Sequence, residues 1–245
     1  QAAIDAINHR VQWPHLGASP YPCESVIPGS ALIITSQRTG YVQHIDVQAL
    51  GAIAKADEIQ IFMDVLPGSF VHVGMPLART VSLNNARGEE LTSSNEKIIA
   101  TLAMGARRTF EHDPRFGLSV LSEIASRALS PAVNDPGTAI DVIGRGVRSL
   151  TCWGTPKEPT AKTDADCQHV YLRGLTVDDL FDDFFAPIAR DGAGLVEVDL
   201  RMMKALVSLA QINPAMFRGA CTRHAERLLK HVNTALVLEE DRQKL

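Results

Sequence analysis

The chain has 245 residues, a formal net charge of −4 and 45% hydrophobic residues. This composition is typical of a globular protein and excludes wholesale disorder. Because it has no basic excess, we expect no nucleic-acid partner. Its longest apolar runs, such as Ala31–Ile34, are much shorter than the roughly 20 residues of a membrane-spanning helix. We therefore expect a soluble chain.

The first third of the chain begins with a helix and then becomes rich in strands. Apolar residues at helical spacing predict a helix over residues 2–12, and the prolines and glycines of residues 14–30 indicate a loop. Strand-like segments follow at Ala31–Thr35, Tyr41–Val47, Ile59–Val65, Phe70–Val73 and Leu77–Leu83, with a short helix at 48–56. We expect residues 1–30 to form an N-terminal helix and loop, and residues 31–90 a small β-barrel-like or sandwich-like module.

From residue 91 onward the pattern is helical. Ser93 and Glu96 have the spacing of a capping box, which predicts a helix that runs to Phe110. Asp113-Pro114 and Asp135-Pro136 each mark a helix start, because aspartate is a good N-cap and proline suits the first helical position. Further helices are expected from Thr176 to about Gly192, at 195–212 and at 215–243, and the polar residues 152–168 predict an exposed loop.

The predicted fold class is therefore α+β, with a small β-rich module followed by an α-helical bundle over residues 91–245. Strands and helices are segregated along the sequence rather than alternating. This order argues against a parallel sheet built from βαβ units.

Two long motifs in the helical part are distinctive. The first runs from Arg107 to Leu118 and contains D-P-R-F-G-L, and the second runs from Ala128 to Ala139 and reads A-L-S-P-A-V-N-D-P-G-T-A. With the upstream element Gly68-x-Phe70-Val71-x-x-Gly74, they resemble a bacterial family of predicted membrane proteins, domain-of-unknown-function family 2254. The resemblance covers most of the chain from about residue 28.

The resemblance implies that membrane helices precede a soluble region, which this chain would be. The first residue is Gln1 rather than methionine, and we expect a longer protein attached to the membrane through an upstream segment, with this region on the cytoplasmic side. We also expect a homo-oligomer, because confinement in a membrane raises the effective concentration of copies. The family brings no known reaction, so no catalytic residue and no cofactor are implied.

Basic residues gather around the first motif, at Arg107, Arg108, His112 and Arg115, and Asp113 lies among them. Guanidinium groups beside a helix N-terminus could bind a phosphate or carboxylate. The alternative is that the arginines complement the negative end of the preceding helix, with Asp113 as a simple N-cap. A tentative anion site and a purely structural role are both open here.

The second motif offers Ser130, Asn134, Asp135 and Thr138 as a polar turn. The alternative is a tight turn between two helices, in which Asp135 only caps the second. A helix of about 16 residues separates this turn from Asp113 and spans roughly 24 Å. The two turns therefore cannot form one active site within a single straight hairpin.

An acidic run, residues 178–183, contains Asp178, Asp179 and Asp182 in the pattern D-D-x-x-D. Carboxylates one helical turn apart share a face, and such oxygen ligands suit Mg²⁺. The alternative is a set of acidic residues that stabilise the positive end of a helix.

The leading hypothesis is a non-enzymatic extramembrane domain that serves assembly, gating or ligand sensing. The alternative hypothesis is a Mg²⁺-dependent hydrolase or transferase that uses the acidic run.

Overall fold

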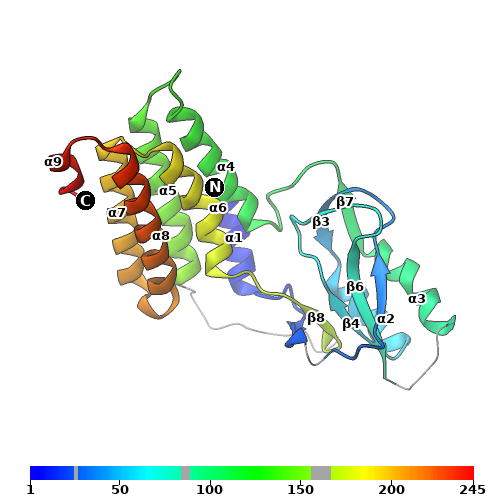
Figure 1. The fold of residues 1–245 in the computed structure, drawn as a ribbon. Helices are drawn as coiled ribbons and strands as arrows, with labels where there is room; N and C mark the ends of the chain where they lie inside the picture. Colours follow the sequence, from blue (N-terminus) through cyan, green and yellow to red (C-terminus); the bar gives the residue numbers. More distant parts are fainter. Residues whose placement is uncertain (25–26, 84–88, 156–166) are drawn as a thin grey trace. The chain divides into compact units, whose positions relative to one another are not determined.

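The computed structural model of the chain describes residues 1–24, 27–83, 89–155 and 167–245, and its elements are drawn in Figure 1. The chain divides into two compact units that interleave along the sequence. The helical unit comprises Gln1–Asn8, Pro114–Lys157 and Leu175–Leu245, and the β unit comprises His9–Asp113 and Glu158–Gly174. Most of the helices are thus separate from the sheets, and the predicted α+β class is confirmed.

The β unit contains two open sheets. The five-stranded sheet has the order β1 (Ser19–Pro20), β8 (Val170–Leu172), β4 (Ile59–Met63), β6 (Pro76–Ser82), β2 (Leu32–Thr35). The three-stranded sheet has the order β5 (Phe70–Val71), β3 (Gly40–Ile45), β7 (Leu102–Gly105). Neither sheet closes on itself among the described residues, so the barrel suggested by the strand pattern does not form.

The pairing in the β unit joins segments that are far apart in the sequence. Strand β8 runs parallel to both β1 and β4, with Val170 opposite Ile61, whereas β4, β6 and β2 are antiparallel. Helix α2 (Val47–Ala56) begins at Asp46, whose carboxylate accepts a hydrogen bond from the backbone N–H of Ala49 at 2.9 Å. The buried face of α2 includes Leu50 and packs into the same core as Ile61 and Leu102.

The structure corrects the helix predicted from Ser93 to Phe110. Helix α3 (Glu89–Ala100) begins before Ser93 and ends ten residues before Phe110, and β7 follows it at once. Strand β7 pairs with β3, with Leu102 opposite Ile45. Apolar residues at helical spacing were therefore misleading here, because sheet pairing overrides local pattern. As a result, residues 91–113 belong to the β unit, and the helical bundle begins at Pro114 rather than at residue 91.

The helical unit contains the remaining helices, and α1 links the two units along the chain. They are α1 (Ala2–Gln12), α4 (Pro114–Ala128), α5 (Pro136–Gly154), α6 (Val177–Asp191), α7 (Val196–Ile212), α8 (Pro214–Ala235) and α9 (Glu239–Arg242). The predicted starts at Asp135 and Thr176 are confirmed: each side chain accepts a hydrogen bond from the N–H three residues on. The predicted helix over 215–243 is two helices, because Leu236 has extended backbone angles.

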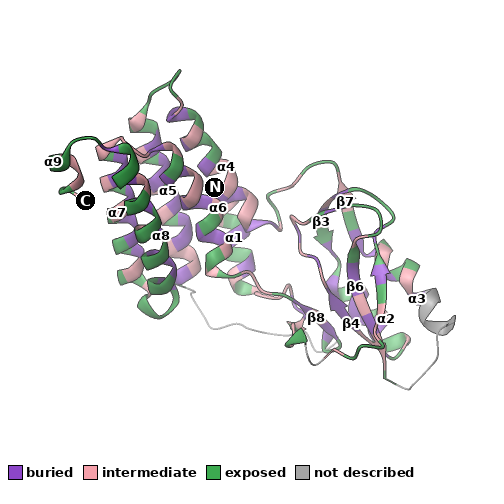
Figure 2. Cartoon of the chain, in the orientation of Figure 1, coloured by how far each residue is buried: buried purple, intermediate pink, exposed green. Residues whose placement is uncertain are grey.

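The core of the helical unit is rich in phenylalanine. Phe181, Phe184, Phe185 and Phe217 are fully buried and their rings are in contact. Figure 2 shows the buried faces of these helices turned toward one another. A Cβ atom at Gly146 of α5 would lie 2.0 Å from the Phe184 ring, so only glycine allows α5 to approach this core.

The predicted loop at 152–168 lies largely outside the described residues. Its first residues belong to α5, which ends at Gly154, and its last include Cys167, which is buried in the β unit. None of the described helices combines the length and apolar character that a membrane span requires.

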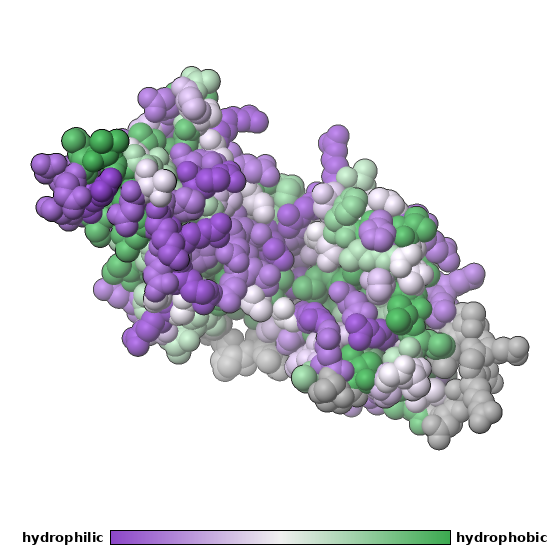
Figure 3. Space-filling model, in the orientation of Figure 1, coloured by the Kyte–Doolittle hydropathy of each residue, from purple (hydrophilic) through white to green (hydrophobic). Residues whose placement is uncertain are grey.

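Several apolar side chains remain on the surface of the helical unit. Val237 and Leu238, between α8 and α9, are 88% and 61% exposed, and Leu229 of α8 is 37% exposed. Figure 3 shows hydrophobic surface at the end of this unit that carries α9. The same stretch also buries Leu228, Val232 and Leu236 in its own core.

Candidate functional site

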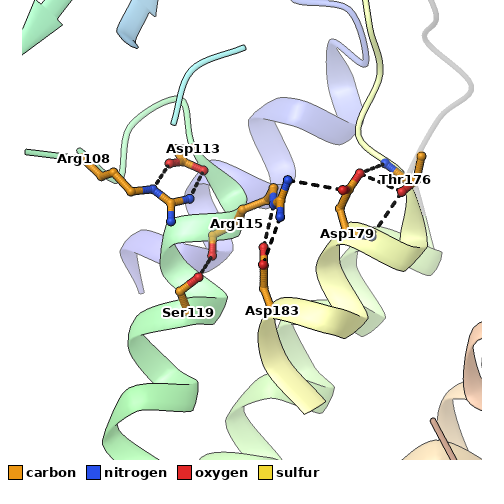
Figure 4. Close-up of polar contacts among 7 residues, drawn as sticks. All are labelled: Arg108, Asp113, Arg115, Ser119, Thr176, Asp179 and Asp183. Atoms are coloured by element: carbon orange, nitrogen blue, oxygen red, sulfur yellow. Dashed lines mark hydrogen bonds and ion pairs between the residues drawn. The ribbon is translucent and has the colours of Figure 1, made fainter. Parts of the chain in front are cut away.

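The acidic run lies in the first two turns of α6, where Arg115 of α4 reaches it (Figure 4). The Nε of Arg115 donates to Asp183 Oδ2 at 2.6 Å and Nη2 donates to Oδ1 at 3.0 Å. The Nη1 of the same side chain lies 3.2 Å from Asp179 Oδ1. One guanidinium group therefore ties two carboxylates of α6 to α4.

The other carboxylates of the run face α8. Arg223 donates to Asp178, and Asp182 lies 3.3 Å from the Nε2 of His224. Burial of His224 lowers its pKa, although the neighbouring Asp182 opposes this effect. Arg227 adds a longer contact to Asp182 at 3.9 Å. We call the whole set the α6 clamp: Asp178, Asp179, Asp182, Asp183, Arg115, Arg223, His224 and Arg227.

The α6 clamp changes the interpretation of the predicted magnesium site. Asp179 is bound toward α4, whereas Asp178 and Asp182 are bound toward α8. Each carboxylate already has a basic partner, and the three do not converge on one point. Within the described part of the chain, no group of three or more His, Cys, Asp or Glu side chains has an arrangement suited to a metal ion.

Two of the three arginines of the first motif also have acidic partners. Arg108 binds Asp113 through two hydrogen bonds, Nε to Oδ2 at 2.7 Å and Nη2 to Oδ1 at 3.0 Å (Figure 4). Arg115 serves the α6 clamp instead, and Arg107 has an exposed side chain. The predicted anion site relied on three arginines acting together, and two of them, Arg108 and Arg115, are held by carboxylates.

Asp113 has a second structural role that the sequence does not reveal. Its carboxylate is only 3% exposed and lies against the turn at Gly68. Gly68 has a φ of +94°, and a Cβ atom there would lie 2.2 Å from Asp113 Oδ2. The first motif and the upstream element that begins at Gly68 are therefore packed together within the β unit. Asp113 also directly precedes α4, as predicted.

The second motif forms the tight connection between α4 and α5. Asn134 has a φ of +47°, and its N–H donates to the Ser130 carbonyl at 2.8 Å. Asp135 accepts from the N–H of Thr138 at 3.0 Å and from its hydroxyl at 2.5 Å, which lowers the pKa of Asp135. The hydroxyl of Ser130 donates to the carbonyl of Arg127 at 2.7 Å. These polar groups are thus used within the turn itself, although the turn is exposed.

Sequence reasoning missed a polar cluster in the β unit. The imidazole of His112 contacts those of His44 and His9, with ring centroids 4.6 Å and 5.4 Å apart. Beside them, Arg10 is only 1% exposed. We call these four residues the histidine–arginine cluster. Of these four, only His112 is a candidate site residue in the sequence, because the others lie in α1 and β3 and no local pattern connects these segments.

A hollow of about 520 Å³ lies next to this cluster in the β unit. It opens between α2, the end of α3 and strands β3 and β7. Alanines and one isoleucine provide most of its wall, and the lining residues are His44, Asp46, Ala49, Ala52, Ile53, Lys97, Ala100, Thr101 and Ala103. His44 therefore belongs both to the hollow and to the histidine–arginine cluster.

One family model matches most of the chain. The model of the family described as "Predicted membrane protein (DUF2254)" matches residues 3–208. The chain therefore belongs to this family, as the two motifs predicted.

Among curated proteins, the chain is similar to uncharacterized proteins of Mycobacterium bovis and Mycobacterium tuberculosis. Each is 33% identical over 116 residues. The match covers 47% of this chain but only 22% of each relative. No solved structure gave a significant match.

Proposed function

We propose that this chain is an extramembrane region of a membrane protein and that it acts by binding and assembly rather than by catalysis. Membership of a family of predicted membrane proteins supports the first part. The observation that carries the second part is the α6 clamp, in which the most enzyme-like pattern of the sequence is occupied by ion pairs. Attachment through an upstream segment and a cytoplasmic location belong to the same proposal.

The α6 clamp supports a structural role because its pairs connect three helices. Arg115 joins α4 to α6, and Arg223 and His224 join α8 to α6. The pair of Arg115 and Asp183 is half-buried and has the two-bond geometry that makes such pairs strong. A magnesium ion would have to displace Arg115 and Arg223 from these carboxylates before it could hold a substrate.

A metal titration separates this proposal from the hydrolase alternative. We expect the melting temperature of the chain to be the same in millimolar Mg²⁺ or Mn²⁺ and in EDTA. We expect Asp183→Asn to lower the melting temperature, whereas Asp141→Asn should have little effect, because Asp141 pairs with Arg145 at the surface of one helix. Stabilisation by Mg²⁺ that is lost in Asp182→Asn would instead support the metal-dependent enzyme.

The membrane part of the proposal has its own test. The longer protein that carries this region should sediment with membranes and resist extraction by salt. Extraction by salt alone would contradict a membrane-spanning parent.

A further inference from the structure

Arg10 is a buried cation with most of its hydrogen-bonding capacity unused. Its Nη2 donates to the His112 carbonyl at 2.9 Å. Its Nε and Nη1 have no hydrogen-bond acceptor among the described residues. Burial lowers its pKa to about 10, which leaves the guanidinium charged at neutral pH. Buried charges are normally paired. The Nε and Nη1 groups of Arg10 therefore need a hydrogen-bond acceptor.

The nearest carboxylate does not fill this need. Asp113 acts on Arg10 electrostatically, but both of its oxygens receive hydrogen bonds from Arg108. Two guanidinium groups therefore share one carboxylate, and the site has an excess of one positive charge. Glu111 also acts on His112, but its side chain is exposed.

The three imidazoles extend this electropositive site toward the solvent. His9 and His44 are exposed and His112 is partly exposed, whereas Arg10 beneath them is buried. His44 also lines the 520 Å³ hollow, which gives the cluster an open side. Exposed side chains change rotamer within nanoseconds, so the imidazoles can turn to admit a small ligand.

We propose that the histidine–arginine cluster binds a small free oxyanion of the phosphate or sulfate class, and that it binds this anion more tightly as the pH falls. The anion accepts hydrogen bonds from the Nε and Nη1 groups of Arg10 and from protonated imidazoles. Because Arg10 is 1% exposed, the imidazoles must turn aside before a ligand can reach it, so the site favours a small free anion over a headgroup held at a lipid surface.

The dependence on pH follows from the charges that face the imidazoles. The facing groups are Arg10 and His15 from the N-terminal segment, Glu111, Asp113 and Arg108 from the segment before α4, and Asp46 and Lys97 around the hollow. Burial, together with Arg10 and the neighbouring histidines, lowers the pKa of His9 and of His112. A bound anion favours the protonated imidazoles, and by linkage protonation favours the anion.

Thermal unfolding in sulfate tests this site, because sulfate keeps its charge between pH 5.5 and 7.5. The melting temperature of the 245-residue chain is measured with sodium sulfate and with sodium chloride at matched ionic strength. The test variant is Arg10→Met, and the matched control is Arg107→Met, which removes an exposed arginine from the same unit. General stabilisation by sulfate acts on all variants alike and cancels in this comparison.

We expect the wild type and Arg107→Met to gain several degrees in sulfate, and Arg10→Met to lose most of this gain. The apparent affinity of the wild type should be about tenfold higher at pH 5.5 than at pH 7.5 if, averaged over this range, half a proton is taken up with each anion. Equal gains in Arg10→Met and the wild type would overturn the site. Equal affinities at the two pH values would overturn the role of the histidines.

A second measurement does not depend on how well Arg10→Met folds. The imidazole NMR signals of the wild type are titrated with pH, with and without sulfate. Sulfate should raise the pKa of His9 and His112, and His112→Gln should reduce the pH dependence of binding while Arg10 remains. Unchanged titration curves in saturating sulfate would overturn the proposal, as would binding only to phosphatidic acid vesicles and to neither free anion.

Discussion

Arg115 of the helical unit and Arg10 of the β unit differ in their exposure and in their pairing with carboxylates. Arg115 is 38% exposed and binds two carboxylates of α6. Arg10 is 1% exposed, and among the described residues it makes one hydrogen bond, to a carbonyl. In the helical unit the charges of the α6 clamp are matched, whereas in the β unit a cation is buried and no carboxylate among the described residues accepts a hydrogen bond from it.

The comparison shows that the role of a charged residue depends on which helices and strands pack against it. Arg115 was a candidate anion ligand in the sequence, but α6 brings acidic residues to it. No sequence pattern marks Arg10 as a site residue, because a basic residue in the last turn of a helix is usually explained by the helix dipole. The unmatched charge is therefore the better candidate for a ligand site, although it lies outside the motifs.

The strongest challenge to this comparison comes from Asp199, a buried carboxyl group in the helical unit. It is fully buried in α7, and burial raises its pKa from 3.8 to about 7, with a smaller contribution from Glu197. The backbone N–H of Gly194 opposes this rise, but no hydrogen bond of normal geometry reaches either carboxylate oxygen among the described residues.

A carboxyl group whose folded pKa is raised contributes stability below its unfolded pKa and loses it as pH rises through the folded value. We therefore expect the wild type to lose stability between about pH 4 and pH 7. Asp199→Asn should remove this slope and stabilise the chain at pH 8 by at most about 4 kcal/mol. Denaturant unfolding at pH 5 and pH 8 measures the difference, and equal slopes in both proteins would show that Asp199 is not protonated on folding.

The second largest change in stability is expected at the pair of Arg108 and Asp113 in the β unit. Asp113→Ala removes the partner of Arg108 and leaves Arg10 without a nearby negative charge. Because the carboxylate is 3% exposed, we expect a loss of about 3 kcal/mol in unfolding free energy. Gly68→Ala should also destabilise the chain, since its Cβ would meet the same carboxylate. A neutral Asp113→Ala would contradict the packing described for this site.

A double-mutant cycle measures the matched charges of the helical unit. Arg115→Met, Asp183→Asn and the double variant should give a coupling free energy of about 1 kcal/mol, because the pair has two hydrogen bonds but is partly exposed. Urea unfolding of the four proteins provides the value. Coupling near zero would mean that this pair does not hold α4 to α6.

A smaller effect is expected at the turn between α4 and α5. Asp135→Ala removes the N-cap of α5 and should lower the melting temperature, because the N–H of Thr138 loses its acceptor. Asp141→Ala, at an exposed position within α5, is the matched control and should change it less. The reverse order would indicate that the exposed turn is strained rather than stabilised by Asp135.

The smallest effect is the predicted self-association. Leu229, Val237 and Leu238 are exposed, and a weak contact between copies would cover them. Sedimentation velocity at tens of micromolar should detect a concentration-dependent shift that Val237→Asp reduces. A constant monomer over this range would refute self-association of the isolated chain.

Much of the fold could be predicted because its signals are local. The helix over 2–12, the helix starts at Asp135 and Thr176 and the strands near 32–35, 59–63 and 76–82 depend on spacing, caps and turns within a few residues. Strand β8 could not be found this way. It has three residues, and it pairs with β4 across more than a hundred positions of the chain.

The sequence by itself determined the α+β class, the family and the local structure of the second motif, since these depend on residues close together in the chain. The tertiary structure alone decided which charges are matched. Hydrogen bonds act over about 3 Å, so the partners of Arg115 and the isolation of Arg10 exist only after α1, α4, α6 and the sheets have packed. For this reason the acidic run forms the ion pairs of the α6 clamp, and the candidate ligand site is centred on Arg10, which lies outside both motifs.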